Sequence, residues 1–223
     1  MPSGEKGGKF PGASFRRNQM AGETSLHGIE WLRDRFSDTR AQAASTIYCD
    51  TEKLPGEEQQ RPASVLVPII ARGDDPTVLF TVRASHLRSG SGQISFPGGR
   101  AEPGDPSPEH TALRETFEEI GLPAERVEIL GRLAHYVTRA GYRITPVIGL
   151  VQPPLALLPN DNEVAEVFEV PLEFLLDRRN HLRHSHQSNG RLRHYFAIPY
   201  GDYYIRGVTA GLLVNLHRHI ARD

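Results

Sequence analysis

The sequence predicts an α/β fold in which one mixed β-sheet is packed between helices, an α/β/α sandwich. Two apolar runs bounded by turn residues, 63–70 (ASVLVPII) and 77–83 (TVLFTVR), are typical of buried strands. A capped helix follows them at 107–121, and helical periodicity returns at 207–220 (GVTAGLLVNLHRHI). We expect this last helix to cover the second face of the sheet.

The other elements can be placed in chain order. The segment 1–62 is expected to be a flexible N-terminal segment, and 63–223 the main domain. A turn at Gly141 separates two strands after the capped helix, and Gly201 with Asp202 suits a tight hairpin turn. The expected elements are a short amphipathic helix at 26–36 outside the main domain, a polar linker at 51–62, strands at 127–137 and 144–151, a short helix opened by Pro171, and hairpin strands at 191–198 and 203–206.

Composition limits the classes of function. The chain has 223 residues and a net charge of −1, which argues against a general affinity for nucleic acid. Its single cysteine, Cys49, excludes an internal disulfide and fits a reducing compartment. No run approaches the ~18 apolar residues of a membrane span, and residues 1–19 lack the apolar core of a secretory signal. We expect a cytoplasmic protein with no membrane or nucleic-acid partner, and homodimer formation stays open.

The helix at 107–121 has a clear beginning and end. Ser107 can accept hydrogen bonds from the exposed amides of the first turn, and Pro108 suits the first helical position. Gly121 suits the residue after the end of the helix. At about 100° per residue, the apolar side chains gather on one face, which we expect to meet the core. That face comprises Leu113, Phe117 and Ile120.

The opposite face of this helix is acidic. Glu115, Glu118 and Glu119 are spaced so that their carboxylates converge, and three such charges repel one another. Arg114 lies one turn before Glu118 and offsets part of this repulsion. Carboxylate oxygens and water are the ligands that Mg²⁺ and Mn²⁺ prefer. The pattern therefore predicts a site for one of these cations, with a solvated acidic face as the alternative.

The run 96–122 (FPGGRAEPGDPSPEHTALRETFEEIGL) resembles the Nudix box, whose usual form is G, five residues, E, seven residues, then R-E-U-x-E-E-x-G-U with U a bulky aliphatic residue. The matching residues of the second half are Arg114, Glu115, Glu118, Glu119, Gly121 and Leu122. Thr116 stands where an aliphatic residue is usual. Five residues lie between Gly99 and the next position of the motif, which is Asp105 rather than Glu. Eight residues rather than seven separate Asp105 from Arg114, which argues against a metal role for Asp105. The resemblance implies a Nudix-type sandwich that hydrolyses diphosphates with a divalent metal held by the helical glutamates.

A second motif lies directly upstream, at 78–99, and resembles the signature of the coenzyme A diphosphatase branch of Nudix hydrolases. Its matching positions are Thr81, Arg83, Arg88, Gly92 and Phe96 through Gly99, with four residues rather than three between the arginines. The resemblance implies substrate-binding roles for Arg83, Arg88, Phe96, Gly98 and Gly99. Two guanidiniums beside a glycine-rich loop suit phosphate binding, although surface ion pairs are the alternative.

The predicted activity is hydrolysis of coenzyme A or acyl-coenzyme A to 3′,5′-ADP and (acyl-)4′-phosphopantetheine. Alternatives are another nucleoside diphosphate derivative (ADP-ribose, NADH or a dinucleoside polyphosphate) and a nucleotide-sensing module without turnover. The general base is expected to be Glu163, next to the loop signals at 159–162, rather than Glu166. Glu118 or Glu119 could also serve as base while binding metal. The residues expected to be catalytic are thus Arg114, Glu118, Glu119 and Glu163.

Two features of the C-terminal third concern its histidines and Arg206. The histidines of the segment 178–194 have no spacing that suits a closed zinc site, so a loop followed by an exposed strand with a solvated surface is expected there. These are His181, His184, His186 and His194. The alternative, which the sequence leaves open, is a basic patch that meets an anionic portion of the substrate or a partner. The segment 203–216 (YYIRGVTAGLLVNL) resembles a helix of the same branch, but Arg206 replaces the expected tryptophan, which argues against a stacking contact.

Overall fold

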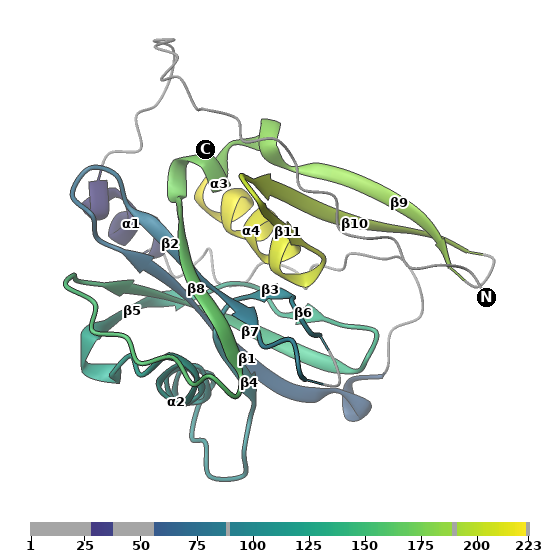
Figure 1. Ribbon diagram of the computed structural model, residues 1–223, viewed down its shortest axis with the longest axis horizontal. Coiled ribbons are helices and arrows are strands. Elements are labelled where there is room, and N and C mark those ends of the chain that lie inside the picture. The colour runs from purple at the N-terminus through teal and green to yellow at the C-terminus, as the bar shows by residue number, and fades with distance from the viewer. Residues whose placement is uncertain (1–27, 38–55, 88–89, 189–190, 222–223) are drawn as a thin grey trace.

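The structure is a computed structural model that describes residues 28–37, 56–87, 90–188 and 191–221 (Figure 1). Cys49 and Arg88 lie outside these ranges. The described elements, in chain order, are α1 (Gly28–Ser37), η2 (Glu57–Gln59), β1 (Arg61–Ile70), β2 (Thr77–Arg83), β3 (Ile94–Ser95), β4 (Gly98–Arg100), α2 (Pro108–Ile120), η3 (Ala124–Arg126), β5 (Val127–Arg132), β6 (Tyr136–Val137), β7 (Tyr142–Val151), β8 (Val164–Pro171), α3 (Leu172–Leu176), η4 (Arg178–Asn180), β9 (Leu182–Ser188), β10 (Arg191–Tyr200), β11 (Tyr203–Arg206) and α4 (Val208–Ile220).

The main sheet is mixed, as the sequence predicts. Its strands follow the order β3-β2-β1-β7-β5, while β4 also pairs with β1, β6 with β7 and β8 with β2. β1 and β7 run parallel along their whole length, from Arg61 opposite Tyr142 to Ile70 opposite Val151. A parallel pair needs a long crossover, and here the crossover contains α2.

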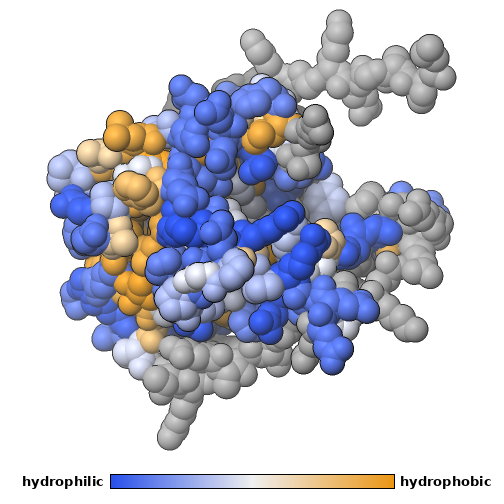
Figure 2. Space-filling view, turned by 90° about the horizontal axis from the view of Figure 1, so that it is seen from below, coloured by the Kyte–Doolittle hydropathy of each residue, from blue (hydrophilic) through white to orange (hydrophobic). Residues whose placement is uncertain are grey.

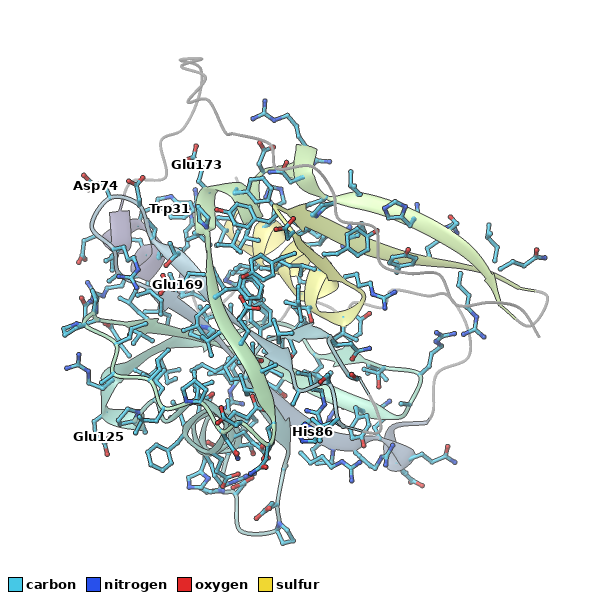
Figure 3. All side chains as sticks on the ribbon, in the orientation of Figure 1. Trp31, Asp74, His86, Glu125, Glu169 and Glu173 are labelled. Atoms are coloured by element: carbon cyan, nitrogen blue, oxygen red, sulfur yellow. The ribbon has the colours of Figure 1, made fainter. Side chains whose placement is uncertain are left out.

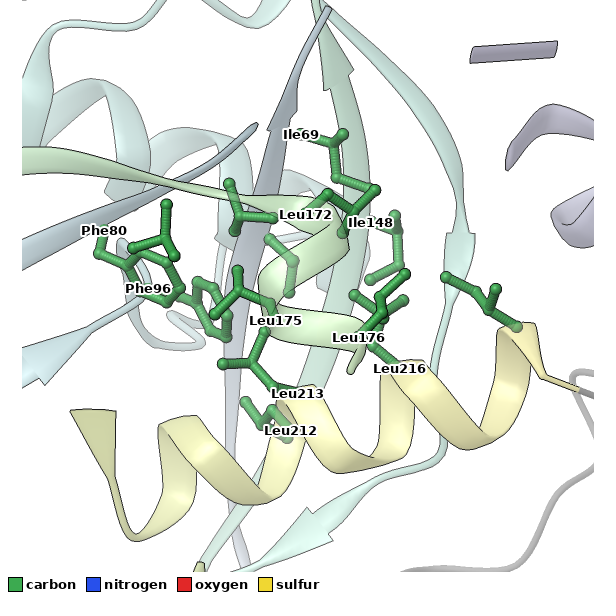
Figure 4. Packing of buried hydrophobic residues seen from close by; sticks show 14 of the residues in the cluster. Ile69, Phe80, Phe96, Ile148, Leu172, Leu175, Leu176, Leu212, Leu213 and Leu216 are labelled. Carbon is green, nitrogen blue, oxygen red and sulfur yellow. The ribbon is translucent and has the colours of Figure 1, made fainter. Parts of the chain in front are cut away.

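Helices cover both faces of the main sheet, which explains why its central strands are apolar on both sides. Successive residues of β1 point to opposite faces, because the side-chain period of a strand is two. Leu66 and Ile70 belong to a core cluster with Ile120 of α2. Ile69 belongs to a second cluster, together with the leucines of α3 and α4. Figure 4 labels Ile69 and these leucines. The predicted α/β/α sandwich is therefore confirmed.

A smaller antiparallel sheet, in the order β11-β10-β9, lies beside α4 (Figure 1). Tyr200 pairs with Tyr203, which leaves Gly201 and Asp202 as the two-residue turn and confirms the predicted hairpin. The ring of Tyr203 stacks on Phe168 of the main sheet with their centroids 3.6 Å apart. This stacking contact links the two sheets.

Three predictions about elements need correction. The single strand expected at 127–137 is two strands, β5 and β6, which pair with different parts of β7. The segment before 191, expected as a loop, contains β9, whose polar sequence suits an edge strand. The helix predicted at 26–36 is present as α1, but Leu32 and Phe36 are buried in the main core rather than lying apart from it. Among the described residues, every helix falls short of the length and apolar character that crossing a membrane requires.

Candidate active site

The capping signals of α2 hold it in place as the sequence predicts. Ser107 has an extended backbone (φ −157°, ψ 162°), and its Oγ accepts a hydrogen bond from the amide of His110 at 3.2 Å. Pro108 occupies the first turn, and Gly121 ends the helix in the left-handed region with φ 68°. These signals fix which residues of α2 can face the sheet and which can face the loops around it.

The orientation of α2 differs from the predicted one. Phe117 is 57 % exposed, whereas Glu119 is only 6 % exposed, so the apolar and acidic faces are not separated as expected. Thr116 is fully buried, and its hydroxyl donates to the carbonyl of Ala112 at 2.6 Å. The prediction assigns the faces of α2 by polarity, but the buried face of the helix includes the small side chains of Thr111, Ala112 and Thr116. The molecule viewed from below is largely hydrophilic, with hydrophobic side chains gathered on one side (Figure 2).

Arg114 and Asp105 form a clamp at the start of the acidic face. The guanidinium of Arg114 donates to both carboxylate oxygens of Asp105, at 3.1 Å and 3.0 Å. The Asp105 carboxylate also accepts hydrogen bonds from the Thr111 hydroxyl and the Glu102 amide, each at 2.9 Å. The Arg114 guanidinium, followed by these other donors, holds the pKa of Asp105 well below its usual range. Asp105 thus acts as an anchor for Arg114.

The other side of the Arg114 guanidinium faces two of the helical glutamates. It donates to Glu115 at 3.0 Å and to Glu118 at 3.2 Å. Glu115 is half-buried at the cavity described next, whereas the Glu118 side chain is 53 % exposed and does not line that cavity. One cation therefore orients two carboxylates, and the three predicted ligands are not equivalent in this structure.

A cavity of about 490 Å³ brings together residues that are far apart in the sequence. Glu115 and Glu119 come from α2, Glu163 from the loop before β8, and Arg83 from the end of β2. The amide of Ala84 donates to the carbonyl of Glu163 at 2.8 Å, so the backbone holds the β2 and β8 ends together. Figure 3 shows Asp74 and His86 at opposite ends of β2, and the cavity lies at the His86 end.

The electrostatics of this cavity favour an added positive charge. Burial, and then the nearby charges of Glu163 and Glu115, raises the pKa of Glu119 to about 8. Burial likewise raises the pKa of Glu115. Among the described residues, the acidic and histidine side chains do not form a preassembled group of three at metal-binding distance. Their chemistry nevertheless suits a hard divalent cation, because Glu115, Glu119 and Glu163 line one cavity and carboxylate oxygens are the ligands that such a cation prefers.

Gly98 and Gly99 of β4, the strand before α2, line the cavity, and the space around them explains why glycines are needed there. Gly98 has φ 152°, and a Cβ at this position would lie 2.4 Å from the carbonyl oxygen of Ser64. A Cβ on Gly99 would lie 2.4 Å from the carboxylate of Glu115. Phe96 is 3 % exposed and stacks on Phe80 at 5.0 Å, so most of its ring belongs to the core.

The remaining candidates lie elsewhere. Glu166 does not line the cavity, and its carboxylate accepts a hydrogen bond from the Tyr203 hydroxyl. His181 contacts the carbonyl of Leu175 at 2.7 Å, and His194 contacts the Ser185 hydroxyl at 2.8 Å. These contacts are structural, and within the described ranges the histidines form no metal-binding group. Residues that line a second, larger cavity, such as Arg193, were not singled out individually from the sequence, because only the tertiary fold brings them to the site.

Comparison with known proteins defines the class of this protein. Residues 60–188 match the NUDIX domain family. The chain is 44 % identical over 164 residues to proteins named "Uncharacterized Nudix hydrolase NudL" from Yersinia pestis (strain Pestoides F) and Yersinia pseudotuberculosis (serotype O:1b, strain IP 31758), an alignment that covers 73 % of this chain and 79 % of each relative. The chain belongs to the NUDIX family, and it is a Nudix pyrophosphohydrolase. Members of this family generally depend on a divalent metal.

Solved structures with weaker similarity include two Nudix proteins. A Nudix hydrolase from M. smegmatis, RenU, has a TM-score of 0.45 and 28 % identity, covering 53 % of this chain and 74 % of that chain. The NUDIX domain of Shewanella oneidensis NrtR, solved with ADP ribose, has a TM-score of 0.45 and 18 % identity, covering 73 % of this chain and 89 % of that chain.

Proposed function

We propose that this protein is a coenzyme A diphosphatase: a hydrolase, dependent on Mg²⁺ or Mn²⁺, that cleaves coenzyme A or acyl-coenzyme A to 3′,5′-ADP and (acyl-)4′-phosphopantetheine. The observation that carries the proposal is the juxtaposition of Arg83 with Glu115, Glu119 and Glu163 around one cavity. Arg83 belongs to the upstream signature that resembles this branch, and the glutamates of α2 belong to the Nudix box.

The ligands proposed for the metal are Glu115, Glu118 and Glu119. The Glu118 side chain is exposed and accepts a hydrogen bond from Arg114. A rotation of this side chain would bring its carboxylate to the metal beside Glu115 and Glu119. A bound divalent cation would supply positive charge for the diphosphate and lower the pKa of a coordinated water. Glu115 and Glu119 would bind it from the helix, and the glycines Gly98 and Gly99 of β4 would keep the backbone close to the substrate.

The chain's own groups account for the remaining chemistry. Arg83 is proposed to bind a diphosphate oxygen by charge-assisted hydrogen bonds. Glu163 is proposed as the general base because its carboxylate faces the same cavity from a separate loop and can accept a proton from the attacking water. Arg114 would orient Glu115 and Glu118 through its hydrogen bonds to them, with Asp105 holding the guanidinium in place. Gly98, Gly99 and Phe96 would shape the substrate-facing wall, and Arg88, outside the described residues, keeps its expected substrate-binding role.

We further propose that residues 63–223 form the hydrolase domain and that the protein acts in the cytoplasm, where its proposed substrate is found. This division leaves α1 as part of the preceding segment that packs onto the core of the domain.

A product assay tests the proposed function. The protein would be incubated with Mg²⁺ or Mn²⁺ and with coenzyme A, acetyl-coenzyme A, ADP-ribose, NADH and a diadenosine polyphosphate in parallel. We expect the highest kcat/KM for coenzyme A or its thioester, with the two products named above. A higher kcat/KM for another diphosphate would retain the hydrolase and overturn the branch assignment, and binding without cleavage would favour a sensing module.

Two variants test the residue roles. Glu119→Gln and Glu163→Gln are each expected to lower kcat by about 10²-fold or more, since general-base and electrostatic contributions are typically this large. Glu166→Gln is the matched control, because Glu166 lies on the following strand outside the cavity. Wild-type turnover by Glu119→Gln at saturating Mg²⁺ would contradict the metal assignment, and wild-type turnover by Glu163→Gln would contradict the base assignment.

A further inference from the structure

A second cavity of about 1150 Å³ extends from the acidic residues into the space between the two sheets. It shares Arg83, Gly98 and Glu119 with the smaller cavity, so the two cavities adjoin at the proposed reaction site. Small-molecule sites usually measure about 300–1,000 Å³. The larger cavity therefore has room for a ligand that extends well beyond a diphosphate.

The charge of the larger cavity is strongly one-sided. Arg139, Arg193 and Arg206 line it, and among its described lining residues Glu119 is the one acidic side chain. None of the ion pairs between described residues involves these three arginines. The Nε of Arg193 is buried and has no hydrogen-bond partner among the described residues. Because a buried donor without a partner is costly, the arrangement favours an anionic ligand here.

The register of the smaller sheet places two of these arginines on one face. Arg206 lies opposite Ala197 in the pairing of β11 with β10. Residues directly opposite one another share a face, and so do alternate residues of one strand. Arg193, Tyr195 and Arg206 therefore belong to the same face of the smaller sheet, and all three line the cavity. The face combines guanidiniums with an aromatic ring, a combination that suits a phosphorylated nucleoside.

These arginines are separate from the group that serves the diphosphate. Arg83 lines both cavities, and its charge acts directly on Glu119. Arg139, Arg193 and Arg206 line only the larger cavity. The beginning of α4 also reaches this cavity, and its first turn carries no acidic residue, so the positive end of the helix adds to the same field.

We propose that the face formed by Arg193, Tyr195 and Arg206 binds a phosphate monoester of the substrate, at a position distinct from the cleaved diphosphate. This inference rests on the proposed function, under which the group is the 3′-phosphate of coenzyme A. Arg139 lines the same cavity from the turn between β6 and β7 and adds positive charge there. Specificity for coenzyme A over diphosphates that lack the monoester would then originate mainly in β10 and β11.

The test compares coenzyme A with 3′-dephospho-coenzyme A, which differ only in this phosphate. The measured quantity is the ratio of their kcat/KM values in the wild type and in Arg193→Ala, Arg206→Ala and Arg206→Lys. A charge-assisted contact contributes about 10- to 100-fold, so we expect the wild type to prefer coenzyme A by at least that factor. Each alanine variant should lose most of the preference, and Arg206→Lys should regain part of it. Arg183→Ala is the matched control, since Arg183 lies on β9 of the same sheet but outside the cavity, and it should keep the wild-type ratio.

A second readout does not depend on turnover. Binding of adenosine 3′,5′-bisphosphate and of adenosine 5′-monophosphate would be measured by calorimetry in chelator, with the same variants. Tighter binding of the bisphosphate that disappears in Arg193→Ala and Arg206→Ala supports the site. Equal binding of the two nucleotides by the wild type overturns it, and so does an equal loss for both substrates in the alanine variants. If neither coenzyme A nor its dephospho form is cleaved, the proposed function fails, and the binding experiment alone then decides the monoester site.

Discussion

Alanine at Gly99 should remove activity without unfolding the protein, whereas alanine at the adjacent Gly98 should destabilise the fold itself. A Cβ on Gly99 would lie 2.4 Å from the Glu115 carboxylate, and ordinary contacts begin at 3.4 Å. The difference, 3.4 − 2.4 = 1.0 Å, is the distance by which the carboxylate must move. This carboxylate is the far end of a flexible side chain, so it can move at little cost in stability.

The catalytic cost of that movement should be large. A misplacement of about 1 Å in a catalytic group can lower the rate by roughly 10²-fold. We therefore expect Gly99→Ala to reduce kcat/KM for the diphosphate substrate by about this factor, with a free energy of unfolding close to that of the wild type. Steady-state kinetics at saturating Mg²⁺ and urea denaturation of the same preparations would measure the two quantities.

Gly98→Ala provides the contrast, because its Cβ would meet the backbone of β1. The nearest atoms are the Ser64 carbonyl oxygen at 2.4 Å and the Val65 Cα at 2.5 Å, and β1 is held by its pairing with β7. Overpacking costs about 1–3 kcal/mol and a strained φ about 1–3 kcal/mol, so a loss of roughly 2–6 kcal/mol is expected. Full activity in Gly99→Ala, or a loss of stability in Gly99→Ala as large as that in Gly98→Ala, would refute the reasoning about Glu115.

Three further predictions concern the clamp, the metal and the contact between the sheets. Asp105→Asn should lower the free energy of unfolding by about 1–3 kcal/mol at pH 7. Because the folded pKa of Asp105 is depressed, its stabilisation is present above the unfolded pKa of about 4 and is lost as the pH falls below that value. The difference between wild type and variant in urea denaturation should therefore be smaller at pH 3 than at pH 7, and a constant difference would contradict the role of the charge. A chelator should abolish turnover, and full turnover in chelator would exclude metal dependence. In thermal unfolding, Mg²⁺ at 100 times its Kd should stabilise the wild type by about 2.7 kcal/mol and should not stabilise Glu119→Gln. Tyr203→Phe keeps the stacking on Phe168 but loses the hydrogen bond to Glu166, so its free energy of unfolding should fall by about 0.5–1.5 kcal/mol. Tyr203→Ala loses both contacts, and its free energy of unfolding should fall by about 3–5 kcal/mol. Equal losses in the two variants would contradict a contribution from the ring.

The fold and part of the site could be predicted from local sequence because their signals are local. Ser107, Pro108 and Gly121 define α2 through interactions within a few residues, and the apolar runs of β1 and β2 define buried strands. Gly201 and Asp202 define the closing turn in the same way. Such features depend on backbone geometry and on short-range hydrogen bonds, which neighbouring residues determine.

The orientation of α2 could not be predicted in this way. Polarity alone favours Phe117 inside and Glu119 outside, but the structure reverses the two. Burying Glu119 beside Glu163 raises its pKa and costs stability in the absence of a cation. Sites that bind ligands often depart from the pattern that stability alone would favour, and the departure becomes visible only when distant segments are brought together.

That Arg139, Arg193 and Arg206 line one cavity could not be predicted from the sequence for a related reason. Arg193 and Arg206 lie in strands whose sequences alternate weakly, and their common face depends on the register between β10 and β11. Arg139 reaches the same cavity from a turn more than fifty residues earlier in the chain. Only the packing of the smaller sheet against the main one reveals that these charges share a cavity.

The division of the described strands into two separate sheets has a consequence for how this protein can evolve or be engineered. Glu115, Glu119 and Arg83 depend on the main sheet and α2, whereas Arg193 and Arg206 belong to strands with no hydrogen-bonded ladder to that sheet. Substitutions in β10 and β11 can therefore alter which molecule is accepted while the residues proposed for bond cleavage keep their geometry. A mutant library confined to the solvent-facing and cavity-facing positions of these two strands should yield altered substrate preferences at undiminished metal affinity.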